Sequence, residues 1–301
     1  MEITVPGSSA NLGGGFDTLA VAVQLYLRVR IVDVRNDGGS RLEVVRSQPA
    51  VPGENPIARA YAAAAREHGG QAPTVRIEAD SEIPMGSGLG SSAAAVVAGL
   101  RVYERVVEPM AEGTLLRLAT AVEGHGDNAA ASLWGGLTSV VDDRYALRWR
   151  WPDELKLVVA TPSTPLATST ARAALAPTLS RGDAVFNLQR VLALVHALEH
   201  GDYGRLREAV QDRWHQPARM ALAPQLEAVL ALDDPEVFGA FLSGAGPSVA
   251  LLARRDFGRI QQRLEEIYER AGSPVTVRVL AAHQSLQVMP AAMASAHGRS
   301  V

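Results

Sequence analysis

Alternating apolar and polar positions dominate the first eighty residues, and a period of two is typical of half-buried strands. The segments that carry this alternation are 25–34, 41–45 and 74–79. Asp37-Gly38-Gly39-Ser40 separates the first two segments and has the composition of a tight turn, so it predicts a hairpin. A helix is expected over 56–68, because Pro56 suits a first helical position and Asn55 can cap it.

Helical periodicity becomes more frequent after residue 90. We expect helices over 92–106 and 112–123, followed by strands over 137–141 and 155–161. The segment 183–200 predicts an amphipathic helix. Its apolar side comprises Val185, Leu188, Val191, Leu192, Val195 and Leu198.

A strand-helix-strand unit closes the pattern. Its elements are expected over 249–253, 257–271 and 275–280. The last dozen residues are rich in alanine and carry no pattern, so we expect them to be frayed. Because the pattern changes past Pro152, we expect a domain boundary near residue 150, which divides the chain into 1–150 and 151–301.

Composition narrows the class of protein. A chain of 301 residues that is 47% hydrophobic can bury a large core, and a net charge of -3 without a basic run gives no sign of a nucleic-acid surface. The absence of cysteine excludes disulfides, thiolate nucleophiles and cysteine metal sites. Lys156 is the only lysine, so phosphate binding or Schiff-base chemistry by any other lysine is excluded.

The N-terminus has an acidic residue, Glu2, and no basic region of the kind that begins a signal peptide. Apolar stretches are interrupted well before the 18 or so residues that a membrane span needs. We therefore expect a soluble, cytoplasmic protein with neither a nucleic-acid nor a membrane partner.

The strongest chemical signal is the glycine-rich segment 83–94, IPMGSGLGSSAA, which follows a predicted strand and enters a predicted helix. Its glycines let the backbone approach a bulky ligand closely. The N-terminus of the helix offers unpaired N–H groups and a partial positive charge, which suit a polyphosphate without any lysine. A glycine-rich turn with a serine cap is the alternative interpretation. The spacing is neither that of a dinucleotide-binding fingerprint nor that of a Walker A loop.

This segment resembles the second motif of the GHMP kinases, P-x-x-x-G-L-G-S-S-A. Residues 5–17, VPGSSANLGGGFD, resemble the first motif of that family, and residues 242–248, LSGAGPS, resemble the third. Three motifs in the family's order make a chance resemblance very improbable. The resemblance extends over nearly the whole chain, to about residue 285.

Other segments resemble the homoserine kinase branch of the family. They are 123–128 (EGHGDN), 168–172 (TSTAR) and 212–219 (DRWHQPAR). The chain departs from the branch where Gly14 and Gly126 replace prolines, and where Ala176 stands in place of a proline expected after Arg172. The change at Gly14 is expected to loosen the loop while keeping Asn11 and Asp17.

The resemblance implies an α+β fold of two domains, with the active site in the cleft between them. It implies ATP-dependent, Mg²⁺-dependent phosphorylation of the side-chain hydroxyl of L-homoserine, and is compatible with a homodimer. ATP binding is assigned to the glycine-rich loop and the helix cap, namely Pro84, Met85, Gly86, Ser87, Gly88, Leu89, Gly90, Ser91, Ser92, Ala93, Ala94 and Asn55. The substrate-binding residues implied are Asn11, Asp17, His125, Asn128, Thr168, Arg172 and Arg219.

The catalytic residues implied are Ser92, Glu123, Asp17 and Asn128. Ser92 and Glu123 would hold the magnesium ion, since a hard cation takes oxygen ligands. Arg172 and Arg219 would bind the substrate carboxylate with their planar forks. Asn128 cannot accept a proton, so we expect direct attack of the hydroxyl on the γ-phosphate without a strong base.

Two alternatives remain open at this point. One is a GHMP kinase for another small alcohol, such as mevalonate or a sugar. The other is a relative without catalytic activity that only senses a nucleotide or an amino acid.

Overall fold

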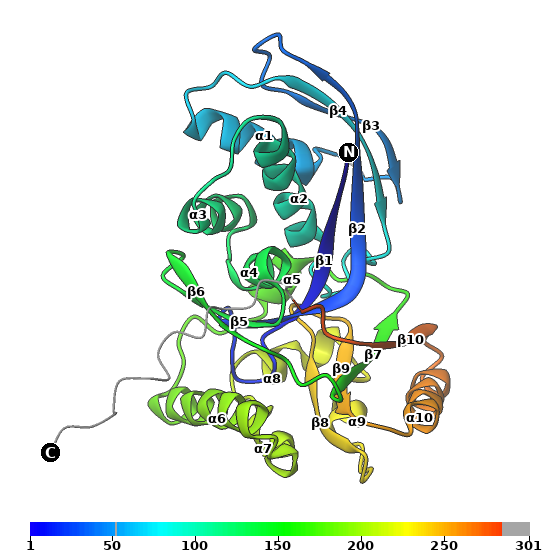
Figure 1. The fold of residues 1–301 in the computed structure, drawn as a ribbon. Helices are drawn as coiled ribbons and strands as arrows, with labels where there is room; N and C mark the ends of the chain where they lie inside the picture. The colour runs from blue at the N-terminus through cyan, green and yellow to red at the C-terminus, as the bar shows by residue number, and fades with distance from the viewer. Residues whose placement is uncertain (52, 285–301) are drawn as a thin grey trace, which may run out of the picture.

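The computed structural model describes residues 1–51 and 53–284 and contains two β-sheets with helices packed around them (Figure 1). The first sheet has six strands in the order β3-β4-β2-β5-β6, with β1 paired to β2. These strands are β1 (Glu2–Ala10), β2 (Leu19–Arg35), β3 (Leu42–Gln48), β4 (Thr74–Ser81), β5 (Leu137–Val141) and β6 (Tyr145–Trp149). The long strand β2 pairs with β1, β4 and β5, and so ties the sheet together.

The predicted hairpin of β2 and β3 is wrong. Strand β4 lies between them, antiparallel to β2 and parallel to β3. The Asp37 carboxylate accepts hydrogen bonds from the hydroxyl and the backbone N–H of Thr74, at 2.8 and 3.1 Å. The turn is therefore tied to the first residue of β4, and that strand takes the place beside β2.

Four helices pack on the first sheet, and two of them lie directly against β1. They are α1 (Pro56–Glu67), α2 (Ser91–Val106), α3 (Glu112–Glu123) and α4 (Asp127–Trp134), the last of which was not predicted. The predicted cap is confirmed, because Asn55 accepts a hydrogen bond from the Ile57 N–H at 2.9 Å. Helices α1 and α2 approach closely at Gly99, where a Cβ would lie 2.2 Å from the Ile57 carbonyl oxygen.

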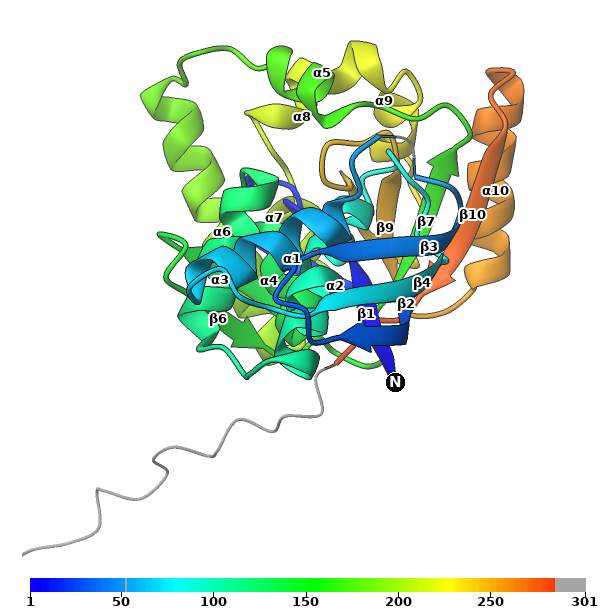
Figure 2. The ribbon, with the colours of Figure 1, turned by 90° about the horizontal axis from the view of Figure 1, so that it is seen from above.

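The second sheet has four strands in the order β10-β7-β9-β8. They are β7 (Lys156–Pro162), β8 (Val237–Leu242), β9 (Val249–Ala253) and β10 (Val275–Leu280). Helix α10 (Phe257–Arg270) packs along β7 and β10, and α9 (Leu226–Leu230) packs near β8 (Figure 2). The strand-helix-strand unit at the end of the chain is confirmed, although β7 lies between its two strands.

The remaining helices connect β7 to β8. They are α5 (Thr168–Ala173), α6 (Arg181–His200), α7 (Leu206–Ala209) and α8 (His215–Arg219), with the short 3₁₀ helices η1 (Tyr203–Arg205) and η2 (Met220–Leu222). Helix α6 has nearly its predicted bounds, but only part of its predicted apolar side is buried. It buries Leu194 and Leu198, whereas Val185, Leu188 and Leu192 are exposed.

The expected α+β architecture is confirmed, and the change of sheets falls between Trp149 and Lys156. One apolar cluster nevertheless contains buried residues from both sides of this point, such as Leu100 and Phe241. We therefore keep the division into 1–150 and 151–301 as a proposal. Within residues 1–51 and 53–284, no helix combines the length and the apolar character needed to cross a bilayer.

Candidate active site

The three glycine-rich segments come together although they are far apart in the sequence. The Ser8 N–H donates to the Leu89 carbonyl oxygen at 3.0 Å, which joins the end of β1 to the central loop. The Ser243 hydroxyl donates to the Gly88 carbonyl oxygen at 2.7 Å and lies 2.8 Å from the Ser9 hydroxyl oxygen. The segment after β8 therefore contacts both the central loop and the end of β1.

Glycine is required at two positions of the central loop. Gly88 has φ +79°, and a Cβ there would lie 2.1 Å from the Ser243 carbonyl oxygen. Gly90 has φ +71°, and a Cβ there would lie 2.2 Å from the Ser8 hydroxyl oxygen. Because Gly90 has no side chain to cap helix α2, the first N–H groups of α2 are available to an anion at Ser91 and Ser92.

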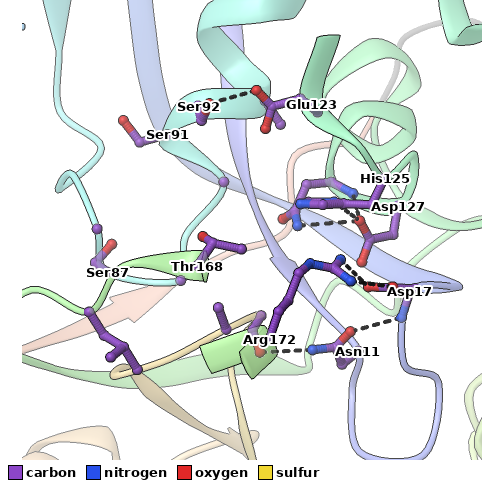
Figure 3. A pocket seen from close by; sticks show the side chains of 18 of the residues that line it. Asn11, Asp17, Ser87, Ser91, Ser92, Glu123, His125, Asp127, Thr168 and Arg172 are labelled. Atoms are coloured by element: carbon purple, nitrogen blue, oxygen red, sulfur yellow. Dashed lines mark hydrogen bonds and ion pairs between the residues drawn. The ribbon is translucent and has the colours of Figure 1, made fainter. Parts of the chain in front are cut away.

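A cavity lies where these loops meet helices α3, α4, α5 and α8 (Figure 3). Most of the predicted site residues line it, and they are Asn11, Asp17, Gly86, Ser87, Gly88, Gly90, Ser91, Ser92, Ala93, Glu123, His125, Asn128, Thr168, Arg172 and Arg219. Five predicted ATP-binding residues do not line it, namely Pro84, Met85, Leu89, Ala94 and Asn55. Two of these, Met85 and Asn55, line a second cavity, and Ser91 lines both cavities.

One end of the main cavity carries a hydroxyl and a carboxylate side by side. The Ser92 hydroxyl donates to the Glu123 carboxylate at 2.6 Å. Burial raises the pKa of Glu123 above its ordinary value, even though the hydrogen bond from Ser92 opposes this. A desolvated carboxylate beside a hydroxyl and a helix N-terminus fits a hard cation bound to a polyphosphate. Within the described residues, no group of three or more His, Asp or Glu side chains is arranged to hold a metal ion by itself.

Between its two ends, the cavity is lined by polar side chains that hydrogen-bond to one another. His125 Nδ1 lies 2.8 Å from Asp127 Oδ1, and this hydrogen bond raises the pKa of His125 above its ordinary value. The Asn128 side-chain oxygen accepts from the Ser8 hydroxyl at 2.8 Å. That oxygen is engaged by Ser8, and the Asn128 amide nitrogen donates one N–H to Asp127 Oδ1 at 3.5 Å, so its second N–H is the group left for a ligand.

At the other end, two carboxylate oxygens meet an arginine fork. Arg172 Nη1 and Nη2 donate to the two oxygens of Asp17 at 2.9 and 2.7 Å. Asn11 braces this loop, because its side-chain oxygen accepts from the Asp17 N–H at 3.1 Å and its NH₂ donates to the Gly244 carbonyl at 2.8 Å. Both polar atoms of Asn11 thus have partners inside the protein.

Arg219 lines the same end and has a different environment. Its side chain is buried, with a relative exposure of only 1%, and donates to the carbonyl oxygens of Ala171 and Gly244 at 3.1 and 3.2 Å. No carboxylate in the described part of the chain forms an ion pair with it. Burial and the nearby Arg172 lower the pKa of Arg219, but a guanidinium stays charged. The cavity therefore contains a buried cation without an anionic partner.

Two aromatic rings hold Arg219 in place. The Phe16 ring centroid lies 5.3 Å from the Arg219 guanidinium carbon and 5.6 Å from that of Arg172. His215 Nδ1 lies 3.2 Å from Arg219 Nη1, and its Nε2 lies 2.9 Å from the Gly13 carbonyl oxygen. Burial lowers the pKa of His215, so the neutral ring donates to Gly13 and accepts from Arg219.

Sequence reasoning missed several residues that line the cavity. They are Phe16, Asp127, Leu166, Gly244 and Ala245. Four of them belong to segments quoted above for their motifs, so the signal was present but not applied to these positions. Leu166 lies in a loop without a motif, and only the tertiary structure places it at the site.

The chain is similar to GHMP kinases and, among them, to homoserine kinases. Residues 55–136 match the family model of the GHMP kinases N terminal domain, and residues 194–270 match that of the GHMP kinases C terminal domain. A homoserine kinase of Solibacter usitatus is 35% identical over 90% of this chain and 91% of its own length. The crystal structure of homoserine kinase from Cytophaga hutchinsonii matches with a TM-score of 0.81 and 26% identity, over 94% of this chain and 95% of that one.

The fold also occurs in proteins with a different substrate. The crystal structure of the Methanococcus jannaschii mevalonate kinase matches 94% of this chain and 98% of its own length, with a TM-score of 0.68 and 14% identity. At this identity the likeness concerns the fold alone.

Proposed function

We propose that this chain transfers the γ-phosphate of ATP to the side-chain hydroxyl of L-homoserine, because it belongs to the GHMP kinase family and to its homoserine kinase branch. The product would be O-phospho-L-homoserine, an intermediate of threonine biosynthesis. We further propose that the reaction takes place in the cytoplasm.

The observation that carries the substrate assignment is Arg219. A buried guanidinium without a carboxylate partner is costly, and a ligand carboxylate would compensate that cost. Arg172 is already held by Asp17, so it would act as a second, weaker contact. The α-carboxylate of homoserine supplies the missing anion, whereas an uncharged alcohol such as a sugar does not.

ATP would bind along the central loop. Its phosphates would contact the first N–H groups of α2, near Ser91 and Ser92. The second cavity is lined by apolar side chains such as Leu27, Ile57 and Met85, and it shares Ser91 with the first. Its position and apolar character suit the adenine ring, which supports the proposal that Asn55 and Met85 take part in nucleotide binding.

Ser92 and Glu123 would hold the magnesium ion. The ion would neutralise charge on the triphosphate, which is the chemistry that phosphoryl transfer requires. The contribution of the chain is to keep one hydroxyl and one carboxylate together beside the N-terminus of α2.

The reaction would proceed by in-line attack. The homoserine hydroxyl oxygen forms a bond to the γ-phosphorus, the bond from that phosphorus to the β,γ-bridging oxygen breaks, and ADP leaves. The amide NH₂ of Asn128 orients the hydroxyl, and the hydroxyl proton departs late, to the transferred phosphoryl group or to water. Asp17 would accept from the substrate ammonium group with the lone pairs that Arg172 does not use.

The direct test is incubation of the protein with ATP, MgCl₂ and L-homoserine, with detection of O-phosphohomoserine by ³¹P NMR. A panel containing mevalonate and galactose should give no phosphorylated product. Turnover of another alcohol but not of homoserine would overturn the substrate assignment. Calorimetric binding of ATP and homoserine without any turnover would instead identify a ligand sensor.

A further inference from the structure

His215 lies beside the substrate end of the site without lining the cavity. Its side chain is completely buried, and it contacts Arg219 at the other end of the short helix α8. A buried histidine next to a buried arginine would be unfavourable if both were charged. The hydrogen bonds of the ring show how the two groups are compatible, and they suggest what His215 does for Arg219.

Hydrogen bonding fixes which nitrogen of His215 carries the proton. Nε2 lies 2.9 Å from the Gly13 carbonyl oxygen, and a carbonyl oxygen can only accept, so the proton is on Nε2. Asp212 does not take this proton, because its carboxylate is 3.7 Å from Nε2 and accepts from Asn187 and from two backbone N–H groups. Burial lowers the pKa of His215, so the ring is neutral at neutral pH and Nδ1 keeps its lone pair.

The lone pair of His215 accepts one of the five hydrogens of Arg219. Nδ1 lies 3.2 Å from Nη1, and the Gly244 carbonyl oxygen lies 3.2 Å from the same nitrogen, so both hydrogens of Nη1 are used. The Nε hydrogen is donated to the Ala171 carbonyl oxygen at 3.1 Å. Nη2 forms no hydrogen bond within the described part of the chain, and its two hydrogens are therefore the ones left for a ligand.

Three acceptors in fixed positions define the plane of the Arg219 guanidinium, because its donors form a rigid fork. All three acceptors are neutral, so they orient the guanidinium without neutralising its charge. The Phe16 ring covers the pair, since its centroid lies 5.4 Å from that of His215, at an interplanar angle of 28°, and 5.3 Å from the guanidinium carbon. This arrangement holds an arginine in one orientation and leaves its charge for a bound anion.

We propose that His215 is a positioning residue for homoserine, which directs Nη2 of Arg219 to the α-carboxylate by accepting a hydrogen from Nη1. This inference deepens the proposed function and rests on it. His215 does not line the cavity, so it acts through Arg219 and not by contact with the substrate. Without its lone pair, one buried Nη1 hydrogen has no partner, the guanidinium is free to turn, and the carboxylate loses an aligned donor.

Calorimetric titration of the full chain with L-homoserine is the first test, together with steady-state kinetics. His215→Leu removes the acceptor, so the Kd for homoserine should rise about tenfold, whereas KM for ATP should change less than about twofold. His215→Asn offers an amide oxygen close to the position of Nδ1 and should bind homoserine within about threefold of the wild type. His200→Leu is the matched control, because His200 is exposed on α6 and outside the cavity, and it should change neither constant.

A substrate analogue separates positioning of Arg219 from general support of the fold. 3-Aminopropan-1-ol lacks the carboxylate, so its kcat/KM should be nearly the same for the wild type and His215→Leu. An equal loss with homoserine and with the analogue, or a raised KM for ATP, would show that His215 only supports the fold and would overturn the proposal. A wild-type measurement is independent of whether the variants fold: ¹⁵N NMR of histidine-labelled protein should show a protonated Nε2 and a bare Nδ1 for His215, and a protonated Nδ1 would contradict the proposal.

A double-mutant cycle tests whether the two residues act as a unit. Because His215→Leu and Arg219→Leu affect one contact with the carboxylate, the double variant should bind homoserine little more weakly than Arg219→Leu alone. Additive losses would mean that His215 acts independently of Arg219, and the proposal would be wrong. If Arg219→Leu itself leaves homoserine binding unchanged, the carboxylate assignment fails and the role of His215 fails with it. If Arg219→Leu weakens binding and a folded His215→Leu does not, the role of His215 alone fails.

Discussion

The carboxylate of Asp17 accepts both terminal nitrogens of Arg172, at 2.7 and 2.9 Å, across a sequence separation of 155 residues. With Asp17 engaged by Arg172, Arg219 forms no ion pair with any acidic side chain in residues 1–51 and 53–284. The two arginines, which the sequence treats alike, therefore have unequal roles in the proposed binding of homoserine.

Arg219→Leu should raise KM for homoserine more than Arg172→Leu does, with KM for ATP nearly unchanged in both. A charge-assisted hydrogen bond contributes about 1.5–3 kcal/mol, which corresponds to roughly one to two powers of ten in kcat/KM. Steady-state kinetics with each substrate varied in turn would measure this. 3-Aminopropan-1-ol lacks the carboxylate and should discriminate little between wild type and the Arg219→Leu variant. Normal homoserine binding by both variants would contradict the carboxylate assignment.

Ser92→Ala and Glu123→Gln should lower kcat much more than they weaken homoserine binding, because the metal acts on the triphosphate. Activity should be lost in excess EDTA and return with MgCl₂. Near wild-type kcat of either variant at saturating magnesium would rule out a metal role for that residue.

The raised pKa of Glu123 has a consequence for magnesium activation. A carboxyl group with a raised pKa becomes protonated at a higher pH than an ordinary glutamate, and the protonated form is a poor metal ligand. The magnesium concentration for half-maximal activity should therefore increase as the pH falls through this pKa. The Glu123→Gln variant, which cannot titrate at this position, should show a flatter dependence, and parallel curves for the two proteins would contradict the explanation.

His125 should impose a limit on activity at the alkaline side. The Asp127 carboxylate raises the pKa of His125 above its ordinary value of 6.5, so the ring keeps a positive charge in the cavity to higher pH. As the pH rises through the raised pKa, the charge is lost, and kcat/KM should fall. Asp127→Asn removes the anionic partner and should move this decline to lower pH. An unchanged pH profile in the variant would show that another group titrates.

Asn128→Ala should be less damaging than the loss of an essential base. General-base catalysis contributes about 10²–10⁴-fold in rate, whereas orientation by one amide should lie near or below the lower end of that range. Single-turnover measurements of the phosphoryl-transfer step would give the loss directly. A decrease near the top of the range would mean that Asn128 takes part in proton transfer through a group next to it.

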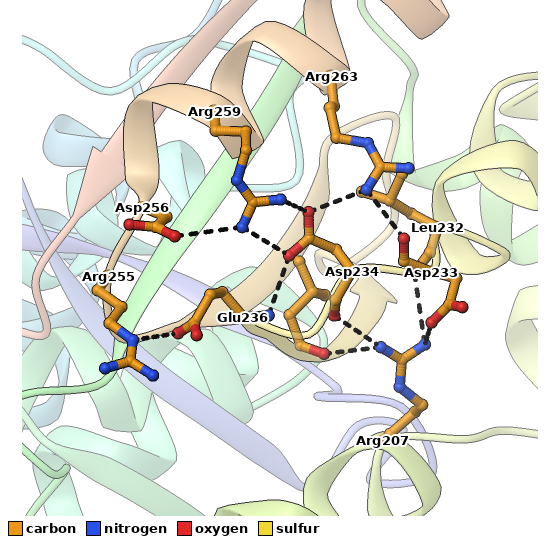
Figure 4. Close-up of polar contacts among 10 residues, drawn as sticks. Arg207, Leu232, Asp233, Asp234, Glu236, Arg255, Asp256, Arg259 and Arg263 are labelled. Carbon is orange, nitrogen blue, oxygen red and sulfur yellow. Dashed lines mark hydrogen bonds and ion pairs between the residues drawn. The ribbon is translucent and has the colours of Figure 1, made fainter.

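An ion-pair network around Asp234 precedes the strand that leads into the third glycine-rich loop. The buried Asp234 carboxylate accepts from Arg259 and, at 2.9 Å, from Arg263 (Figure 4). Burial alone would raise the pKa of Asp234, but the hydrogen bonds from Arg259 and the Glu236 N–H lower it overall. The network therefore stabilises the folded state at pH values above the ordinary pKa of an aspartate. This contribution is lost as the pH falls through the lowered pKa of Asp234.

Asp234→Ala should reduce the free energy of unfolding by about 2–3 kcal/mol. This is less than the loss of a fully buried ion pair, because both arginines are more than a third exposed and water screens their charges. Asp256→Asn removes the charge of an exposed pair with the same Arg259 and keeps a residue that tolerates the positive φ of +55° at this position, so it should cost about 0.5 kcal/mol or less. Urea denaturation at neutral pH and at pH 3 would compare them, and the difference between the variants should be smaller at the lower pH.

Local signals in the sequence determined a large part of this structure. The helix α1 begins at its predicted cap, the glycine-rich loop enters α2 at its serines, and β9, α10 and β10 appear at or within one residue of their expected bounds. These features depend on neighbouring residues, since caps, turns and periodicity are set within a few positions. The family motifs likewise indicated the chemistry, because phosphate binding at a helix N-terminus needs particular residues in a particular order.

Only the tertiary structure decided how distant parts pair. Alternation indicated which positions of β2 and β3 face the core. It does not indicate which strand pairs with which, because any neighbouring strand has the same alternation. In the structure β4 lies between β2 and β3. Periodicity likewise marked an apolar side of α6, but only the packing of the chain decided which of its side chains are buried. The pairing of Asp17 with Arg172, and hence the free charge of Arg219, depends on the spatial approach of loops far apart in the chain, which no local pattern encodes.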